Sequence, residues 1–208
     1  MRLVSIVLFV AVAWMVPAFA QQRSAPKKPP TFAEAVDAAK KAADGEQFGS
    51  AISSLQAAIL DLQKKQRAAV LAGLPKPGGW EIQDDEVDEN ADQLTAATTA
   101  VGMTVHRQYR KGDAQSLNVE VTANSPMLQM LAIMFANPAV ITADGGELVQ
   151  YGAHKAILKK SGDSGQELQI LMHDKHLIHV TAQGLSADDL LKIFDQAFVD
   201  RMEKPLGK

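Results

Sequence analysis

The hydrophobic period of this chain changes at residues 74–80, LPKPGGW, and that change constrains the fold more than any other feature. Before it, apolar side chains from Phe48 to Leu62 recur every three or four residues, which is the period of a helix. After it, apolar and polar side chains alternate, for example over residues 116–123, as in a strand with one buried face. The two prolines and two glycines between them cannot continue a helix. The sequence therefore predicts helices first and a sheet afterwards.

Residues 32–73 are expected to form a helical hairpin. Thr31 can cap the first helix, and Glu34 three residues later completes a capping box. Gly45 is suited to the left-handed cap that ends this helix. A second, longer helix is expected from about residue 46 to residue 72.

The second helix carries an apolar seam with the four-three spacing of a heptad repeat: Phe48, Ile52, Leu55, Ile59 and Leu62. Through Ala39, Phe48 and Ala51, the helix pair also resembles a single tetratricopeptide-type unit. Such units need neighbours to bury a continuous core, and the chain holds no second copy. We therefore interpret the pair as a plain helical hairpin docked on the rest of the protein.

Residues 74–208 are expected to form one α+β sandwich domain. The expected strands cover residues 80–82, 101–110, 116–123, 146–160 (as two strands or one bent strand) and a hairpin over 167–184. Ser125-Pro126 opens a Met-rich helix, and Ser186 caps a single last helix. Strands joined by short turns predict an antiparallel sheet, packed against the Met-rich helix and the C-terminal helix, rather than a parallel design.

The first 20 residues have the pattern of a secretory signal peptide. Arg2 precedes an apolar run that ends in the A-x-A cleavage pattern of residues 18–20. As a membrane anchor, this run would be short and is broken by Pro17. Residues 21–31 are proline-rich and polar, and are expected to be a disordered spacer.

The composition limits the cellular compartments and the classes of partner that suit this chain. The chain has no cysteine, so an exported form has neither disulfides nor thiolate ligands. We expect a soluble periplasmic protein without stable membrane insertion after cleavage. A net charge of −3 argues against nucleic acid or an anionic membrane surface as the main partner.

Five stretches carry a resemblance to a family: LPKPGGWE, HRQYRKG, ANSPMLQMLAIMFANP, ADGGELVQYGAHKAI and SADDLLKIFDQ. They resemble an uncharacterised family of exported proteobacterial proteins, from residue 33 to the C-terminus. That family has no established activity, so the resemblance implies no catalytic residues. At the level of the fold, the sheet region is also similar to the antiparallel sandwiches of the PsbP and Mog1 type, which does not imply a function.

Three of the five histidines lie in HDKHLIH, residues 173–179, which raises the question of a metal site. Side chains alternate faces along a strand, so His176 and His179 cannot bind one ion from a single strand. Placing the apolar residues of both strands on one face sets residue 172 opposite 178. His173 and His179 then share the other face, with His176 in the turn. A register shifted by one residue would instead place His173 opposite His176.

A zinc site needs three or four protein ligands. His154 or His106 could complete a set with His173 and His179 only through a tertiary contact. We therefore favour a solvated hairpin tip. Metal binding through His173, His179 and His154 is the alternative.

The helix over residues 126–136, PMLQMLAIMFA, has one polar residue, Gln129. A helix that is apolar all round is buried on several sides or faces a partner or ligand, and methionine suits adaptable apolar surfaces. A core helix covering the sheet is the alternative. The candidate contact residues are Met127, Met130, Met134, Leu131 and Phe135.

Other chemistry has little support from motifs. In the acidic run 84–92, aligned as a calcium loop, Gln93 and Thr99 stand where glycine and a bidentate glutamate are needed, so we expect a solvated loop. The tyrosine and arginine of HRQYR, residues 106–110, are expected to be exposed on a strand. Motifs of serine hydrolases, zinc proteases, nucleotide-binding loops and dinucleotide-binding folds do not occur, and no cofactor is predicted.

Three functional hypotheses follow. The first is a non-enzymatic periplasmic protein that contacts an envelope protein or an apolar ligand through the Met-rich helix. The second is a periplasmic metal-binding protein that uses the His-rich hairpin. The third is a hydrolase with a site assembled from dispersed residues, which no motif supports.

Overall fold

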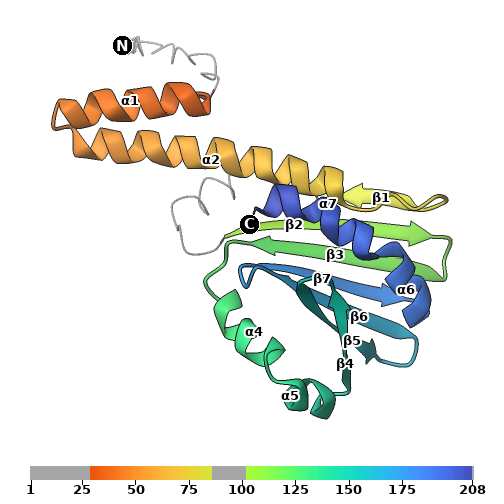
Figure 1. Ribbon diagram of the computed structural model, residues 1–208. Helices are drawn as coiled ribbons and strands as arrows, with labels where there is room; N and C mark the ends of the chain where they lie inside the picture. Colours follow the sequence, from red (N-terminus) through yellow and green to blue (C-terminus); the bar gives the residue numbers. More distant parts are fainter. Residues whose placement is uncertain (1–28, 86–101, 208) are drawn as a thin grey trace, which may run out of the picture.

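The computed structural model describes residues 29–85 and 102–207 of the chain (Figure 1). The helices are α1 (Phe32–Asp44), α2 (Phe48–Gly73), α4 (Leu128–Phe135), α5 (Pro138–Ala143), α6 (Ala187–Ile193) and α7 (Gln196–Leu206). The strands are β1 (Glu81–Asp84), β2 (Met103–Lys111), β3 (Gln115–Ala123), β4 (Gly146–Tyr151), β5 (His154–Ser161), β6 (Gly165–Met172) and β7 (His176–Gln183). The predicted signal peptide, most of the spacer and nearly all of the acidic run lie outside the described residues.

The strands form a seven-stranded antiparallel sheet in the order β1-β2-β3-β7-β6-β5-β4. Hairpin turns join β2 to β3, β4 to β5, β5 to β6 and β6 to β7, whereas β3 and β7, which are distant in the sequence, pair in the middle of the sheet (Figure 1). The segment between them holds α4, α5 and the β4–β5–β6 meander. The predicted α+β class with an antiparallel sheet is confirmed.

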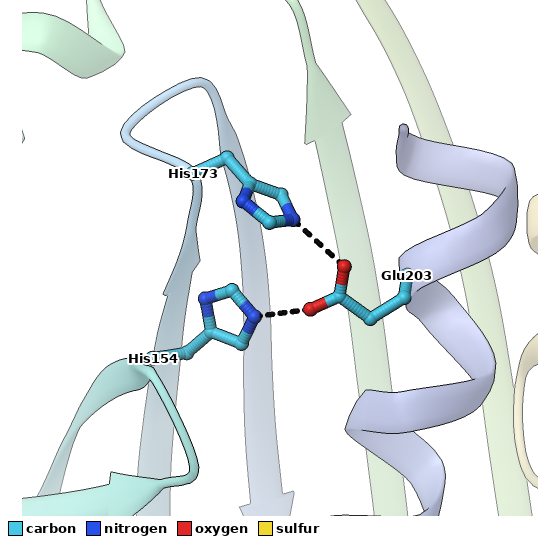
Figure 2. Close-up of side chains that lie close together, drawn as sticks. All are labelled: His154, His173 and Glu203. Carbon is cyan, nitrogen blue, oxygen red and sulfur yellow. Dashed lines mark hydrogen bonds and ion pairs between the residues drawn. The ribbon is translucent and has the colours of Figure 1, made fainter. Parts of the chain in front are cut away.

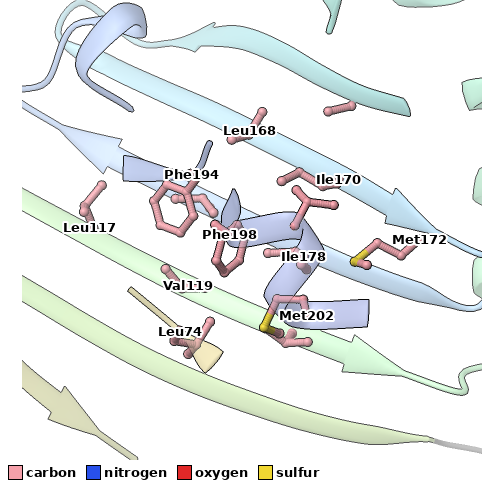
Figure 3. Packing of buried hydrophobic residues seen from close by; sticks show 14 of the residues in the cluster. Leu74, Leu117, Val119, Leu168, Ile170, Met172, Ile178, Phe194, Phe198 and Met202 are labelled. Atoms are coloured by element: carbon pink, nitrogen blue, oxygen red, sulfur yellow. The ribbon is translucent and has the colours of Figure 1, made fainter. Parts of the chain in front are cut away.

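One face of the sheet carries the main hydrophobic core. The main-core residues of β3, β6 and β7 recur at every second position, which places them on a single face. The C-terminal part of α2 together with α6 and α7 covers this face, and Phe194, Phe198 and Met202 pack against the strands (Figure 3). The Phe194 and Phe198 rings meet edge to face, with centroids 5.2 Å apart.

The opposite face is covered at one end by α4 and α5. Phe135 and Ile141 from these helices pack on Ile157 and Leu171 of the sheet, forming a second, smaller cluster. Because Ile157 and Leu171 alternate with core-face residues along their strands, this cluster lies on the far side of the sheet from α7.

The helical hairpin projects beyond the sheet as an arm (Figure 1). Its two helices pack through small side chains, since Ala35 and Ala39 of α1 and Ala51 and Ala58 of α2 are buried. The capping box at Thr31 is present as predicted. The left-handed position after α1 was wrongly assigned: Gly45 has a φ of −91°, and the next residue, Glu46, has a φ of 57°.

At its other end α2 joins the sheet domain. Val70 and Leu74 belong to the main core. Gly73 allows close approach of α7, because a Cβ there would lie 2.9 Å from Met202 Sδ. The second half of α2 is therefore part of the same packed body as the sheet.

Two predictions about helix ends were wrong. Ser125 does not cap α4; instead the Leu128 and Gln129 amides bond to the carbonyls of Ser125 and Pro126 in a tight turn that precedes the helix. The last helix is two helices, because Asp195 caps a new one by accepting a hydrogen bond of 2.8 Å from the Phe198 amide. The predicted Ser186 cap of the first of these is confirmed.

The expectation that the tyrosine and arginine of HRQYR are exposed was also wrong for two side chains. Tyr109 and Arg107 lie on the core face and are buried. The Tyr109 hydroxyl donates a 3.0 Å hydrogen bond to the Pro75 carbonyl. Arg107 donates to both carboxylate oxygens of Asp84 on the neighbouring strand. The Tyr109 hydroxyl and two guanidinium nitrogens of Arg107 thus have specific partners, while Arg107 Nη1 has none among the described residues.

Truncation of Phe198 tests how far the main core depends on α7. Phe198→Ala should lower the free energy of unfolding by about 3–5 kcal/mol, because it removes a fully buried ring and leaves a cavity. Ile133→Ala, at a side chain that is 73% exposed, should change it by less than about 0.5 kcal/mol. Urea denaturation followed by circular dichroism gives both values. A loss below about 1 kcal/mol for Phe198→Ala would contradict this account of the core.

Candidate functional site: a histidine–glutamate cluster

Three polar side chains from distant parts of the chain meet at one end of the sheet (Figure 2). His154 is the first residue of β5, His173 lies in the turn between β6 and β7, and Glu203 is near the end of α7. His154 faces the core side because it pairs with the buried Tyr151 and alternates with Ala156 and Leu158. Glu203 reaches the same point because the neighbouring Met202 is packed into the core.

The carboxylate of Glu203 bridges the two imidazoles (Figure 2). Its Oε1 lies 2.5 Å from His154 Nε2, and its Oε2 lies 2.9 Å from His173 Nε2. The two rings meet edge to face at 4.8 Å between centroids. The side chain of His154 is 8% exposed and that of Glu203 is 28% exposed, so the cluster is half-enclosed and open to solvent on one side.

The charge of this carboxylate is stabilised by its two partners. The hydrogen bond from His154, followed by that from His173, lowers the pKa of Glu203 below its ordinary value, although partial burial acts in the opposite direction. Glu203 also stands in the last turn of α7, where the helix dipole disfavours a negative charge. The two imidazole N–H groups offset that cost.

The turn that carries His173 has an unusual backbone. His173 and Asp174 have φ values of 52° and 54°, in the left-handed region. A turn whose two central residues both have positive φ values favours Asn, Asp or Gly there, because other side chains are strained. Backbone strain of this kind concentrates at functional sites. His173 therefore occupies a position where turn stability alone would favour a different residue.

A third histidine lies beside the cluster. His176 is buried on the core face, opposite Met172 and Ala123, and its ring centroid is 6.4 Å from that of His173. Its Nδ1 has no hydrogen-bond partner among the described residues. Burial, together with the nearby charges of His173 and Lys175, lowers the pKa of His176 below its ordinary value of 6.5. His176 is therefore a neutral imidazole at physiological pH.

The cluster opens into a cleft of about 670 Å³ at the end of the sheet. The cleft is lined by Ala132, Phe135, Ala136, Ala153, His154, Lys155, Leu171, His173, Asp174 and Glu203. One wall is thus the inner side of the Met-rich helix, and the other is the polar cluster. A smaller pocket of about 300 Å³ lies beneath α5 and contains neither histidine nor glutamate.

The candidate contact residues of the Met-rich helix differ in how far they are exposed to solvent. Met127 and Met130 are 75% and 76% exposed, and Ile133, which was not among the candidates, is 73% exposed. Leu131 and Met134 are half-buried. Phe135 is 2% exposed and belongs to the second core cluster. The free apolar surface of α4 therefore consists of Met130 and Ile133, together with Met127 at its N-terminal cap.

The predicted register of the histidine hairpin was wrong. Met172 pairs with His176 rather than with residue 178, so the loop is residues 173–175 and His176 begins a strand. His179 lies on the other face, where its Nε2 is 2.9 Å from Glu167 Oε1.

Of the three metal candidates from the sequence, His154 and His173 come together and His179 does not. Sequence reasoning missed Glu203. A signal was present: Glu203 interrupts the apolar stripe formed by Val199, Met202 and Leu206, all of which are buried.

Comparison of the chain with known protein families, curated proteins and solved structures finds no match. The resemblance to an exported proteobacterial family and to PsbP and Mog1 sandwiches therefore stays a prediction. Within residues 29–85 and 102–207, no helix has the length and apolar character needed to cross a membrane.

The burial of His176 predicts a pH-dependent stability. Below pH 6.5 the unfolded chain protonates this imidazole while the folded protein resists protonation, so the free energy of unfolding should fall as the pH drops from 7.5 towards 5.5. His176→Gln should reduce this pH dependence, because glutamine does not titrate.

Urea denaturation at several pH values measures the effect. Equal slopes for His176→Gln and wild type would contradict the role of burial.

Proposed function

We propose that the protein is a non-enzymatic, exported binding protein that holds one divalent transition-metal ion at His154, His173 and Glu203. The observation that carries this proposal is the convergence of three ligand atoms, one from each residue, all within 4.8 Å of one another. They come from a strand, a turn and a helix that are remote in the sequence, so their meeting is a product of the fold.

The donor set favours zinc. Two imidazole nitrogens and one carboxylate oxygen are a recurring three-ligand set for Zn²⁺ that leaves a fourth position open to water or another ligand. With metal–ligand bonds of about 2.1 Å, neighbouring ligand atoms around a tetrahedral ion lie roughly 3.4 Å apart. The present atoms need to move by only about 1 Å to reach that geometry. Copper and nickel also accept imidazole ligands and are the competing ions.

The protonation state of the candidate ligands also supports the proposal. The lowered pKa of Glu203 keeps its carboxylate charged, as a metal ligand requires. Entry of an ion would replace the two hydrogen bonds and release the Nε2 protons, so affinity should fall in acid. The strained turn at His173 and the unpartnered Nδ1 of the neighbouring His176 are consistent with a site selected for binding rather than for stability.

The exported location and the absence of catalysis are supported by the sequence. Residues 1–20 have the charge, apolar run and A-x-A end of a signal peptide. In a cysteine-free chain, histidine and carboxylate side chains are the strongest metal ligands available. The chain has no recognised catalytic motif, which favours a binding role over the hydrolase alternative.

Isothermal titration calorimetry with Zn²⁺ and Cu²⁺ tests the proposal. Wild-type protein should bind one Zn²⁺ per chain with a dissociation constant of about 10 μM or tighter. His173→Asn removes one ligand but keeps a residue that tolerates the left-handed turn, and it should weaken binding at least about tenfold. Glu203→Gln should do the same.

The matched control is His179→Asn, which removes a histidine from the same hairpin but on the other face. Its affinity should equal that of wild type. A wild-type dissociation constant weaker than about 0.1 mM, or equal losses for His173→Asn and His179→Asn, would leave only adventitious binding by exposed imidazoles.

A second candidate function rests on the outer face of α4. Met127, Met130 and Ile133 each expose about three quarters of their side chains in the described structure. Methionine-rich apolar surfaces adapt to varied partners, and this surface lies on the same helix that walls the cleft. An envelope protein or an apolar ligand is the expected partner.

Affinity capture from envelope extracts tests this surface. The double variant Met127→Glu/Met130→Glu should lose the partners that wild type retains, because charge opposes apolar contact. Gln129→Glu, at an exposed position of the same helix, adds charge without removing methionine and should retain them. An unchanged set of partners in the double variant would exclude the outer face of α4 as the contact.

A further inference from the structure

The arm carries an apolar stripe that the described part of the chain leaves uncovered. The stripe runs along α2, and its side chains expose between 41% and 65% of their surface. Its members are Phe48, Ile52, Leu55, Ile59 and Leu62. Isolated exposed apolar side chains are normal, but a contiguous row of five on one helix marks an interaction surface.

The pattern of this stripe matches a two-stranded coiled-coil seam. The spacing assigns Ile52 and Ile59 to a positions, and Phe48, Leu55 and Leu62 to d positions. Apolar residues repeated at a and d positions form the seam along which the helices of a coiled coil pack. Asp61 is the only charged residue between Phe48 and Leu62; it accepts hydrogen bonds from the Phe32 amide and from Lys65 within the same chain. No charge of the stripe itself therefore opposes its pairing with an identical stripe.

The neighbouring sides of α2 are already occupied. Ala51 and Ala58 are buried under α1. Beyond Leu62 the helix enters the sheet domain: Gln66 Nε2 donates a 3.0 Å hydrogen bond to the Pro205 carbonyl, and Val70 is in the main core. The open seam is thus limited to the arm, over a length of about 21 Å.

We propose that the seams of two copies of this chain pack together and form a two-fold dimer through the arms. The five side chains expose on the order of 500 Å² per copy, so a pair buries roughly 1,000 Å², the lower bound for a specific interface. An interface between identical stripes is self-complementary, as a two-fold dimer requires.

The two arms run antiparallel in this dimer. Each seam continues directly into its own sheet domain at Gln66 and Val70. A parallel pair would bring both sheet domains to the same end of the two seams. An antiparallel pair places them at opposite ends of the seams, where they do not compete for the same space.

Sedimentation equilibrium on the purified protein tests the dimer. Wild type should be dimeric at about 50 μM, and Leu55→Glu and Ile59→Glu should each raise the dissociation constant at least about tenfold. Ser50→Glu, on the exposed side of the same helix turned away from the seam, is the matched control and should remain dimeric.

Circular dichroism establishes that the variants fold, which is expected because the fully buried residues between α1 and α2 are Ala35, Ala39, Ala51 and Ala58. A monomeric wild type at 50 μM overturns the proposal, whether or not another protein binds the arm. A dimer that survives both Leu55→Glu and Ile59→Glu overturns it as well. Zinc binding should be unchanged in these variants, so this test is independent of the proposed metal site.

Single cysteines report the direction of the arms without background, since the chain has none. In an antiparallel dimer, where a positions face d positions, a mixture of the Phe48→Cys and Ile59→Cys proteins should form the mixed disulfide on oxidation, and Phe48→Cys alone should not form one. Efficient disulfide formation by Phe48→Cys alone would show parallel arms and overturn the antiparallel arrangement.

Discussion

The packing of α7 on the sheet determines where the functional groups of this protein lie. Phe198 and Met202 are fully buried against the central strands (Figure 3), and with Val199 and Leu206 they fix the rotation of the helix about its axis. Glu203 is the residue next to Met202, so the same rotation directs its carboxylate to the end of the sheet where His154 and His173 stand. The hydrophobic contact is extensive and the polar contact is small. The apolar packing therefore determines the position of Glu203, and the polar cluster forms where that position brings its carboxylate next to the two histidines.

The two faces of the sheet contribute differently to the cleft. Helices cover the core face along its length, whereas α4 and α5 cover only one end of the opposite face. The cleft lies at that end, and its lining includes Leu171 and Phe135 from one side of the sheet and His154 and Glu203 from the other. A ligand there would touch both layers of the protein. This arrangement links the Met-rich helix to the polar cluster, although the two are separate features in the sequence.

Much of the fold was predictable because strands and helices have different apolar periods. The alternation over residues 116–123 and 167–184 located three strands correctly. Alternation defines which side chains share a face, but it does not distinguish registers that differ by two residues. The predicted pairing of residue 172 with 178 preserved the correct apolar face and still misplaced His176 and His173. The turn that sets the true register depends on two residues in the left-handed conformation, His173 and Asp174. Histidine and aspartate adopt this conformation in only a minority of cases, so their presence does not predict it.

The apolar stripes of α2 and α7 show why the partner of a helix cannot be predicted from its period. In both stripes apolar side chains recur every three or four residues, and both stripes cover one side of their helix. The α7 stripe is covered by the sheet of its own chain. The α2 seam projects beyond the sheet, and the alanines of α1 cover only the neighbouring flank of α2. Topology alone separates these outcomes, since it decides how far each helix extends over the sheet. A stripe that the chain's own sheet does not cover is shielded from water only by another surface. In the proposed dimer that surface is the identical stripe of a second copy.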